Sequence, residues 1–243
     1  MEFRTVLRSA FQLLRDRPLL FLPKLLMTAV WSLFWIQLIQ GVTQPIAMQP
    51  AQARRLLGYM LLLVPVQILV YNAYFIIVRQ YNTDTVDIWS AFRQGLGKLP
   101  QGLGAFFIPF IVGSLVAVPG SSLFILGQLN GNLLYQAAGL VLASAGLLVV
   151  TILFYFTPVS VVLGDSGFIE EFKRGYRQSR HHLRPVTGIA LLSFVLLAVT
   201  TLLEGGLQRI GFIGFVLGRL VSSVINLYVL LVNPSMLLEL EEN

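Results

Sequence analysis

The sequence predicts an all-α integral membrane protein with six transmembrane helices and three shorter amphipathic helices at the cytoplasmic interface. Three observations lead to this fold class. Of the 243 residues, 56% are hydrophobic and only 12% are charged, whereas soluble domains average about 45–50% and about 25%. Six apolar stretches are long enough to cross a bilayer, and a basic amphipathic segment precedes every second stretch. Because a water-soluble fold could not bury this much apolar surface, a soluble globule is excluded.

The six apolar stretches each meet the length of roughly 20 residues that a helix needs to cross a hydrocarbon core of about 30 Å. They run Leu19–Gln40, Leu56–Val78, Leu103–Leu126, Tyr135–Leu163, Val186–Leu203 and Ile210–Leu238. The fourth and sixth would each extend about 43 Å as straight helices. We therefore expect these two to be tilted or bent, or to begin in the interface. All six belong to one predicted membrane domain over residues 1–243.

The basic residues predict the topology. The chain has 17 Lys and Arg against 11 Asp and Glu, a net charge of +6. Thirteen basic residues fall on one side of the predicted membrane: Arg4, Arg8, Arg15, Arg17, Lys24, Arg79, Arg93, Lys98, Lys173, Arg174, Arg177, Arg180 and Arg184. The other side receives Arg54, Arg55, Arg209 and Arg219. Since cytoplasmic loops are rich in Lys and Arg, we expect a multi-pass protein of the cell membrane with both termini cytoplasmic. The same rule explains the net charge without a nucleic-acid partner.

An amphipathic segment precedes each odd-numbered stretch, with apolar residues in the i, i+3, i+4, i+7 rhythm of a helix. The apolar faces contain Phe3, Val6, Leu7, Ala10, Phe11 and Leu14; Ile88, Trp89, Phe92 and Leu96; and Phe168, Ile169, Phe172, Tyr176 and Leu183. The opposite faces are basic, which is typical of helices that lie on anionic headgroups. We therefore predict lipid-headgroup contacts for Arg174, Arg177 and Arg180 of the third segment.

The third segment also carries signals for a helix start. Asp165 or Ser166 can cap it, and Glu170 and Glu171 lie near the positive end of its dipole. Glu170 and Arg174 form an i, i+4 pair. Helix capping therefore explains the two carboxylates better than acid/base catalysis does.

The three segments recur at a spacing that predicts internal repeats. Ser9-Ala10-Phe11 recurs as Ser90-Ala91-Phe92, 81 positions later, and Phe172 follows 80 positions after Phe92. A proline ends each segment, at Pro18, Pro100 and Pro185. The even-numbered stretches share the marks Asn72-Ala73, Thr157-Pro158 and Asn233-Pro234. We predict three degenerate repeats of about 80 residues (about 1–82, 83–164 and 165–243); the alternative is coincidence among apolar segments of low complexity.

The stretch Phe156-Thr157-Pro158-Val159-Ser160-Val161-Val162-Leu163, with Gly167-Phe168 and then Phe172-Lys173-Arg174-Gly175-Tyr176-Arg177-Gln178-Ser179, resembles the signature of a loose group of six-span prokaryotic membrane proteins. That group includes the membrane domain found beside some glycerophosphoryl diester phosphodiesterases and several uncharacterised polytopic families. The match is good over a short part of the chain and elsewhere covers only the layout. The chain has no soluble phosphodiesterase domain, so the resemblance implies a membrane module and no phosphodiesterase activity.

Catalytic, metal and cofactor sites are not expected. The chain has no cysteine, which excludes disulfides, thiolate metal sites and cysteine nucleophiles. Its two histidines, His181 and His182, are adjacent and would point about 100° apart on a helix, so they do not share one metal ion easily. No motif of a serine hydrolase, zinc protease, P-loop or dinucleotide-binding protein occurs. The glycines around Lys98 lack the context of a phosphate loop and predict a flexible bend.

Polar and small residues within the apolar stretches give two further expectations. Gly214, Gly218 and Ser222 form a stripe of small residues that lets helices approach closely, within one chain or between chains. Gln67, Asn72, Ser222, Ser223 and Asn226 lie at membrane depth. They are expected to hydrogen-bond between helices, and the alternative is a polar path for translocation.

Glu204 and Arg219 are the most unusual charges in the chain. If the sixth stretch begins at Ile210, Arg219 lies about 14 Å into the bilayer, where a lone arginine costs about 2.5–3.5 kcal/mol. Glu204 is the acidic residue predicted on the same side, so the two form a candidate intramembrane pair that could close the outer end of a cavity. The alternative is a start near Phe215, with Arg219 extending to the outer interface.

These expectations favour a non-catalytic polytopic membrane protein that binds lipid or a partner protein, or forms a homo-oligomer, as a scaffold or accessory subunit. The near-absence of ionisable residues within the stretches argues against proton or ion coupling. The alternative function is a transporter or lipid flippase with a cavity between the repeats. An enzyme acting on lipid is a third class.

Overall fold

The computed structural model describes residues 3–42, 50–83 and 85–242, and every regular element within these ranges is a helix. Side chains are described except at residues 3–4, 35–42, 50–53, 55–57 and 242, so Arg4 and Arg55 lie outside the described side chains. The all-α class predicted from the sequence is confirmed.

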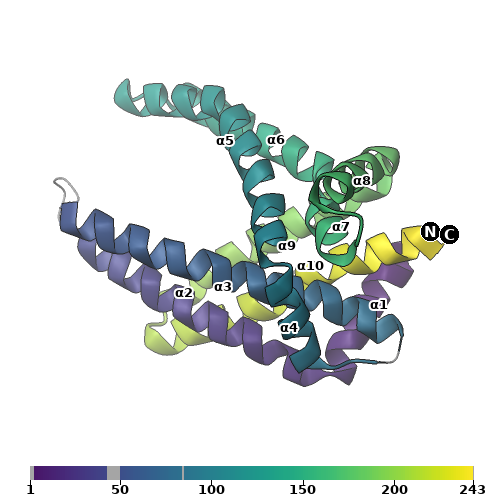
Figure 1. The fold of residues 1–243 in the computed structure, drawn as a ribbon. Coiled ribbons are helices and arrows are strands. Elements are labelled where there is room, and N and C mark those ends of the chain that lie inside the picture. Colours follow the sequence, from purple (N-terminus) through teal and green to yellow (C-terminus); the bar gives the residue numbers. More distant parts are fainter. Residues whose placement is uncertain (1–2, 43–49, 84, 243) are drawn as a thin grey trace. The chain divides into compact units, whose positions relative to one another are not determined.

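The helices belong to two compact units (Figure 1). The first unit, residues 1–99 and 193–243, contains α1 (Phe3–Asp16), the short 3-10 helix η1 (Pro18–Leu20), α2 (Phe21–Val42), α3 (Pro50–Asn82), α4 (Ile88–Gly97), the second half of α9 (Leu183–Gln208) and α10 (Phe212–Glu242). The second unit, residues 100–192, contains α5 (Leu99–Leu129), α6 (Leu133–Leu153), α7 (Thr157–Leu163), α8 (Phe168–His181) and the beginning of α9.

Five helical segments of the described chain are long and apolar enough to cross a membrane: Gly58–Asn82, Leu99–Leu129, Leu133–Leu163, Leu183–Gln208 and Phe212–Glu241. They correspond to the second through sixth apolar stretches of the sequence. A sixth is added if the bent pair Thr5–Asp16 and Pro18–Phe34, whose helices meet at 96°, is counted as one span. The bend follows from Pro18, because proline restricts the residue before it and lacks the N–H that would continue α1.

The fourth stretch is broken rather than straight. α6 ends at Leu153, and α7 starts at Thr157 with Pro158 in its first turn. The N–H of Thr157 donates to the carbonyl of Phe154 at 3.1 Å, which closes a tight turn between the helices. Pro158 has no N–H to continue the α6 ladder. This break accounts for the excessive length of Tyr135–Leu163.

α8 packs against α7 through its smallest residues. The sequence predicted an apolar face with Phe168, Phe172 and Tyr176, which are half-buried. The fully buried residues of α8 are instead Glu171, Gly175 and Ser179. A Cβ on Gly175 would lie 2.7 Å from the Cα of Thr157, so the two backbones touch. The Ser179 hydroxyl donates to the Gly175 carbonyl at 3.0 Å and accepts from the Phe156 N–H at 3.1 Å. Close backbone approach therefore decides which face is buried.

The start of α8 also differs from the expectation. Its N-cap is Gly167, at φ +97°, and not Asp165 or Ser166. Glu171 is 2% exposed. Its carboxylate accepts from the Ser160 hydroxyl at 3.0 Å and from the Ser166 N–H at 3.3 Å. This carboxylate thus joins α8 to α7 and the loop before α8 instead of capping the helix.

Arg174 lies on the next turn of α8. The sequence pairs it with Glu170, whereas the structure places its Nη1 3.8 Å from Oε2 of Glu171. Glu171, which is held between α7 and α8, is therefore one partner of Arg174.

α4 and α1, the other two short helices, pack in related ways. α4 lies against α3, where the Asn72 side-chain amide donates to the Gly95 carbonyl at 3.2 Å. A Cβ on Gly95 would lie 3.1 Å from the backbone nitrogen of Ala73. α1 lies against α10, and the Tyr228 hydroxyl donates to the Leu7 carbonyl at 3.2 Å. Each short helix is therefore held on a long one partly by contacts to backbone.

The close approach of α8 to α7 predicts a specific cost of adding one carbon. Gly175→Ala should lower the free energy of unfolding by about 1–3 kcal/mol, because the added methyl overlaps backbone that cannot swing away. Gly205→Ala is the matched control, since its Cβ would meet nothing within 4 Å in the interior of α9. Thermal unfolding in detergent measures both, and equal midpoints for the two variants would contradict the packing.

Candidate functional site

One face of α10 is polar. Arg219, Ser222, Ser223 and Asn226 follow the i, i+3, i+4, i+7 rhythm and so share one side of the helix. Ser223 donates its hydroxyl to the Arg219 carbonyl at 2.7 Å, and the Asn226 amide donates to the Ser222 carbonyl at 2.8 Å and to its hydroxyl oxygen at 3.2 Å. These bonds within the helix partly satisfy polar groups that an apolar span would otherwise leave unpaired.

An ion pair joins this face to α9. The Arg219 Nη1 lies 3.4 Å from the Glu204 Oε2, and the two side chains are only 30% and 16% exposed. Gly218 makes the approach possible, because a Cβ there would already lie 3.3 Å from the Cα of Glu204. The Arg219 guanidinium also lies 5.5 Å from the ring centre of Phe215. The structure thus brings together the two charges that the sequence singled out.

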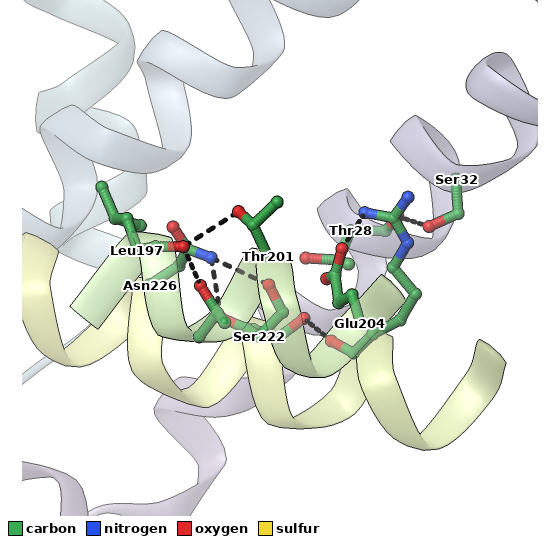
Figure 2. Close-up of polar contacts among 10 residues, drawn as sticks. Thr28, Ser32, Leu197, Thr201, Glu204, Ser222 and Asn226 are labelled. Carbon is green, nitrogen blue, oxygen red and sulfur yellow. Dashed lines mark hydrogen bonds and ion pairs between the residues drawn. The ribbon is translucent and has the colours of Figure 1, made fainter. Parts of the chain in front are cut away.

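The start of α10 lies between the two starts that the sequence left open. The helix begins at Phe212, so Arg219 is seven residues, or about 10 Å, inside it. Figure 2 shows Glu204 of α9 beside Thr28 and Ser32 of α2, with Ser222 of α10 near it. The pair therefore sits in a polar region and not at an isolated helix end.

A cavity of about 390 Å³ lies against the polar face of α10. α2 contributes Lys24, Met27, Thr28 and Trp31; α3 contributes Gln67 and Tyr71; α10 contributes Arg219, Ser222, Ser223 and Asn226. On each helix the lining residues are spaced by three or four, as one helix face requires. The volume falls in the range of about 300–1,000 Å³ that is usual for small-molecule sites.

The cavity lining is cationic. It contains Lys24 and Arg219 and no carboxylate. Glu204 compensates Arg219, so Lys24 is the excess charge. Its ammonium lies 5.1 Å from the ring centre of Tyr71, a cation–π contact that holds it at the wall. The Tyr71 hydroxyl accepts from the Gln67 amide at 2.6 Å.

Two buried donors at the cavity have no partner. They are the indole Nε1 of Trp31 and the Nε of Arg219. The Oε1 of Glu204 is a buried acceptor without a partner. An unsatisfied buried polar atom costs about 1–3 kcal/mol, and such atoms often mark a functional site. Two residues of the cavity lining, Trp31 and Arg219, therefore carry buried N–H donors that the described part of the chain does not use.

A second basic surface lies on α8. A recess of about 520 Å³ is lined by Arg174, Tyr176, Arg177, Gln178, Arg180, His181 and His182. It includes all three predicted headgroup contacts. No acidic residue is among the lining residues. We call this set the α8 basic recess.

The two histidines lie within the α8 basic recess. Their ring centres are 6.4 Å apart and their planes meet at 74°. Across the part of the chain that the structure describes, no group of three His, Asp or Glu side chains could hold a metal ion. The recess is therefore a cationic surface.

The three residues of the predicted small-residue stripe lie in two different environments. Gly214 and Gly218 face α9, where added Cβ atoms would meet the Leu207 carbonyl and Glu204. Ser222 instead lines the cavity. The predicted stripe therefore combines two residues of a close contact within the chain, Gly214 and Gly218, with one residue of the cavity lining, Ser222.

The α2 residues and Tyr71 of α3 were not identified as site residues from the sequence, whereas Gln67, Ser222, Ser223 and Asn226 were expected at membrane depth. Lys24 was counted only as a topology signal, and Trp31 and Tyr71 were not assigned to any site. The periodic spacing of Lys24, Thr28 and Trp31 on one helix face was the available signal. It does not reveal which helix lies opposite.

A family model described as a domain of unknown function, DUF7847, matches residues 1–237. No curated protein and no solved structure matches the chain.

The Glu204–Arg219 pair predicts non-additive effects of substitution. Glu204→Gln and Arg219→Gln should each lower stability by about 1–3 kcal/mol, because each leaves a largely buried charge unpaired. The double variant should recover about 0.5–3 kcal/mol relative to the sum of the single losses. Unfolding midpoints of the four proteins in one detergent measure this coupling, and strictly additive losses would exclude a coupled pair.

Proposed function

We propose that this chain, which belongs to the DUF7847 family of unknown function, is a non-catalytic polytopic membrane protein that binds membrane lipid. In this role it acts as a scaffold or accessory subunit for a partner protein or for a second copy of itself. The observation that carries the proposal is the α8 basic recess, where cationic side chains gather without a carboxylate in the lining.

The chemistry of the α8 basic recess suits anionic headgroups. Arg177, Arg180 and His181 are exposed, so they are accessible to a lipid phosphate. Each Lys or Arg near an anionic membrane surface contributes about 1 kcal/mol of attraction. Ile169 in the first turn of α8 is 66% exposed, and Leu183 at the start of α9 is 44% exposed. Exposed apolar side chains beside basic ones are what an interfacial helix needs to lie on a bilayer.

We further propose that the protein lies in the cell membrane with both termini in the cytoplasm. This location is supported by five or six helices of sufficient length and apolarity. The positions of thirteen basic residues also support this orientation, because they lie before or at the start of the first span, between the second and third spans, and between the fourth and fifth spans. In this topology α1, α4 and α8 lie at the cytoplasmic interface, where their arginines meet lipid headgroups.

The three-repeat architecture is part of the proposal. α4 packs against α3, α8 against α7, and α1 against α10. Each short helix therefore contacts the even-numbered stretch of the preceding repeat. For α1 of the first repeat, the preceding repeat is the third, as in a closed ring of three. The contacts of α4 and α8 fall on the recurring marks at Asn72-Ala73 and Thr157. This recurrence supports repeats over coincidence.

Transport or flipping of lipid is the second candidate function. The polar cavity favours it, since its lining comes from α2, α3 and α10, which belong to the first and third proposed repeats. Repeat-built transporters place their sites in this way, at the interface of repeats. Movement of a labelled phospholipid between leaflets of liposomes that contain the protein would distinguish transport from binding alone.

The α8 basic recess predicts selective loss of anionic-lipid binding. Arg177→Gln with Arg180→Gln should weaken the affinity for phosphatidylglycerol by more than about tenfold, because two headgroup contacts of about 1 kcal/mol each are removed. Arg174 is left in place because of its contact with Glu171. The measurement is phosphatidylglycerol per protein after detergent extraction from mixed nanodiscs.

The matched control for this charge change is Arg54→Gln with Arg209→Gln, two exposed residues on the predicted outer side. The control should retain phosphatidylglycerol at the wild-type level. Equal retention by all three proteins would contradict the proposed role of the α8 basic recess.

A further inference from the structure

We infer that the polar cavity lined by α2, α3 and α10 binds a phosphate group, carried either by a phospholipid headgroup or by a free anion. This site adds to the proposed lipid binding. It rests on that proposed function only where the phosphate belongs to a lipid and not to a free anion. The site itself is separate from the α8 basic recess, since none of its lining residues belongs to α8.

Charge selects an anion. Lys24 and Arg219 line the cavity, and no acidic residue does. Glu204 pairs with Arg219 and is not a lining residue, so it compensates only the Arg219 charge. A cationic ligand would meet like charge, and an apolar ligand would leave the lining polar groups without partners. An anionic ligand instead supplies the negative charge that neutralises Lys24.

Hydrogen bonding selects a ligand rich in acceptors. Two of the lining residues carry a buried side-chain nitrogen without a partner, Trp31 Nε1 and Arg219 Nε, and both atoms are N–H donors. A phosphate diester has only acceptor oxygens, and several of them, so it can serve both donors while it pairs with the Lys24 ammonium. Charge-assisted bonds of this kind are about twice as strong as neutral ones.

The lining residues are held in place before a ligand arrives. Lys24 lies over the Tyr71 ring, and the Tyr71 hydroxyl is bonded to Gln67. Arg219 is oriented by Glu204. Because these contacts fix two long side chains, less conformational entropy is lost on binding. A cavity of about 390 Å³ has room for a headgroup as well as a bare phosphate.

The test is calorimetric titration of delipidated full-length protein in a nonionic detergent. The three titrants are dihexanoylphosphatidylglycerol below its micellar concentration, sodium phosphate and sodium hexanoate. We expect phosphate-bearing titrants to bind and hexanoate to bind at least about tenfold more weakly, since a carboxylate offers fewer acceptor oxygens. Tighter binding of the phospholipid than of phosphate identifies lipid as the source, and equal binding identifies the free anion; both outcomes support a phosphate site.

Lys24→Gln should lower the affinity by about tenfold or more, the loss expected when one charge-assisted hydrogen bond is removed. Lys24→Arg keeps the charge and should restore most of the affinity. Glu204→Gln with Arg219→Gln removes the pair without leaving a lone charge and should also weaken binding. Arg209→Gln, an exposed site outside the cavity, is the control and should bind as the wild type does.

Three results would overturn the inference: no binding of either phosphate-bearing titrant, equal binding of hexanoate, or unchanged affinity in Lys24→Gln. Circular dichroism of each variant establishes that it is folded, and Glu204→Gln with Arg219→Gln carries the test if Lys24→Gln is not. Arg177→Gln with Arg180→Gln separates this inference from the proposed function, because it should leave the cavity isotherm unchanged while it lowers lipid retention.

Discussion

The ion pair between Arg219 and Glu204 is the interaction on which the polar interior of the first unit depends. An arginine inside an otherwise apolar helix is stable only with a partner, and Glu204 of α9 supplies it at 3.4 Å. Gly218 lets α9 come close enough for this contact. The pair then fixes the rotation of α10, so that Ser222, Ser223 and Asn226 line the cavity with α2 and α3.

Both candidate binding surfaces use the same chemistry, although they belong to different units. The cavity presents Lys24 and Arg219, and the α8 basic recess presents arginines and histidines; neither lining contains a carboxylate. A lipid phosphate complements both. The difference lies in exposure: the cavity holds buried donors without partners, whereas the recess is open and suits weaker, less selective contacts. Within the proposed function, the recess favours association with the membrane and the cavity favours selection of a headgroup.

The sequence predicted what depends on composition and local rules. The apolar stretches correspond to long helices, and Pro18 and Pro158 coincide with breaks because proline acts through its own neighbours. Glu204 and Arg219 stood out because charges are rare in such stretches. The buried residues of α8 were not predicted: Gly175 is buried by contact between backbones, which depends on the tertiary partner and not on hydrophobicity. Lys24 and Tyr71 were missed for the same reason, since they join the polar residues of α10 in one site only once α2, α3 and α10 are assembled.

The central claim is that α10 has a polar, water-accessible face toward the cavity and an apolar face toward lipid. The absence of cysteine from the sequence makes single-cysteine labelling direct. Ser222→Cys places a thiol in the cavity lining, and Val224→Cys places one on an exposed apolar position of the same helix. In reconstituted protein, a hydrophilic thiol reagent should label Ser222→Cys much faster than Val224→Cys, because a thiol in hydrocarbon does not ionise. Equal rates, or an unreactive Ser222→Cys beside a reactive Val224→Cys, would contradict the account.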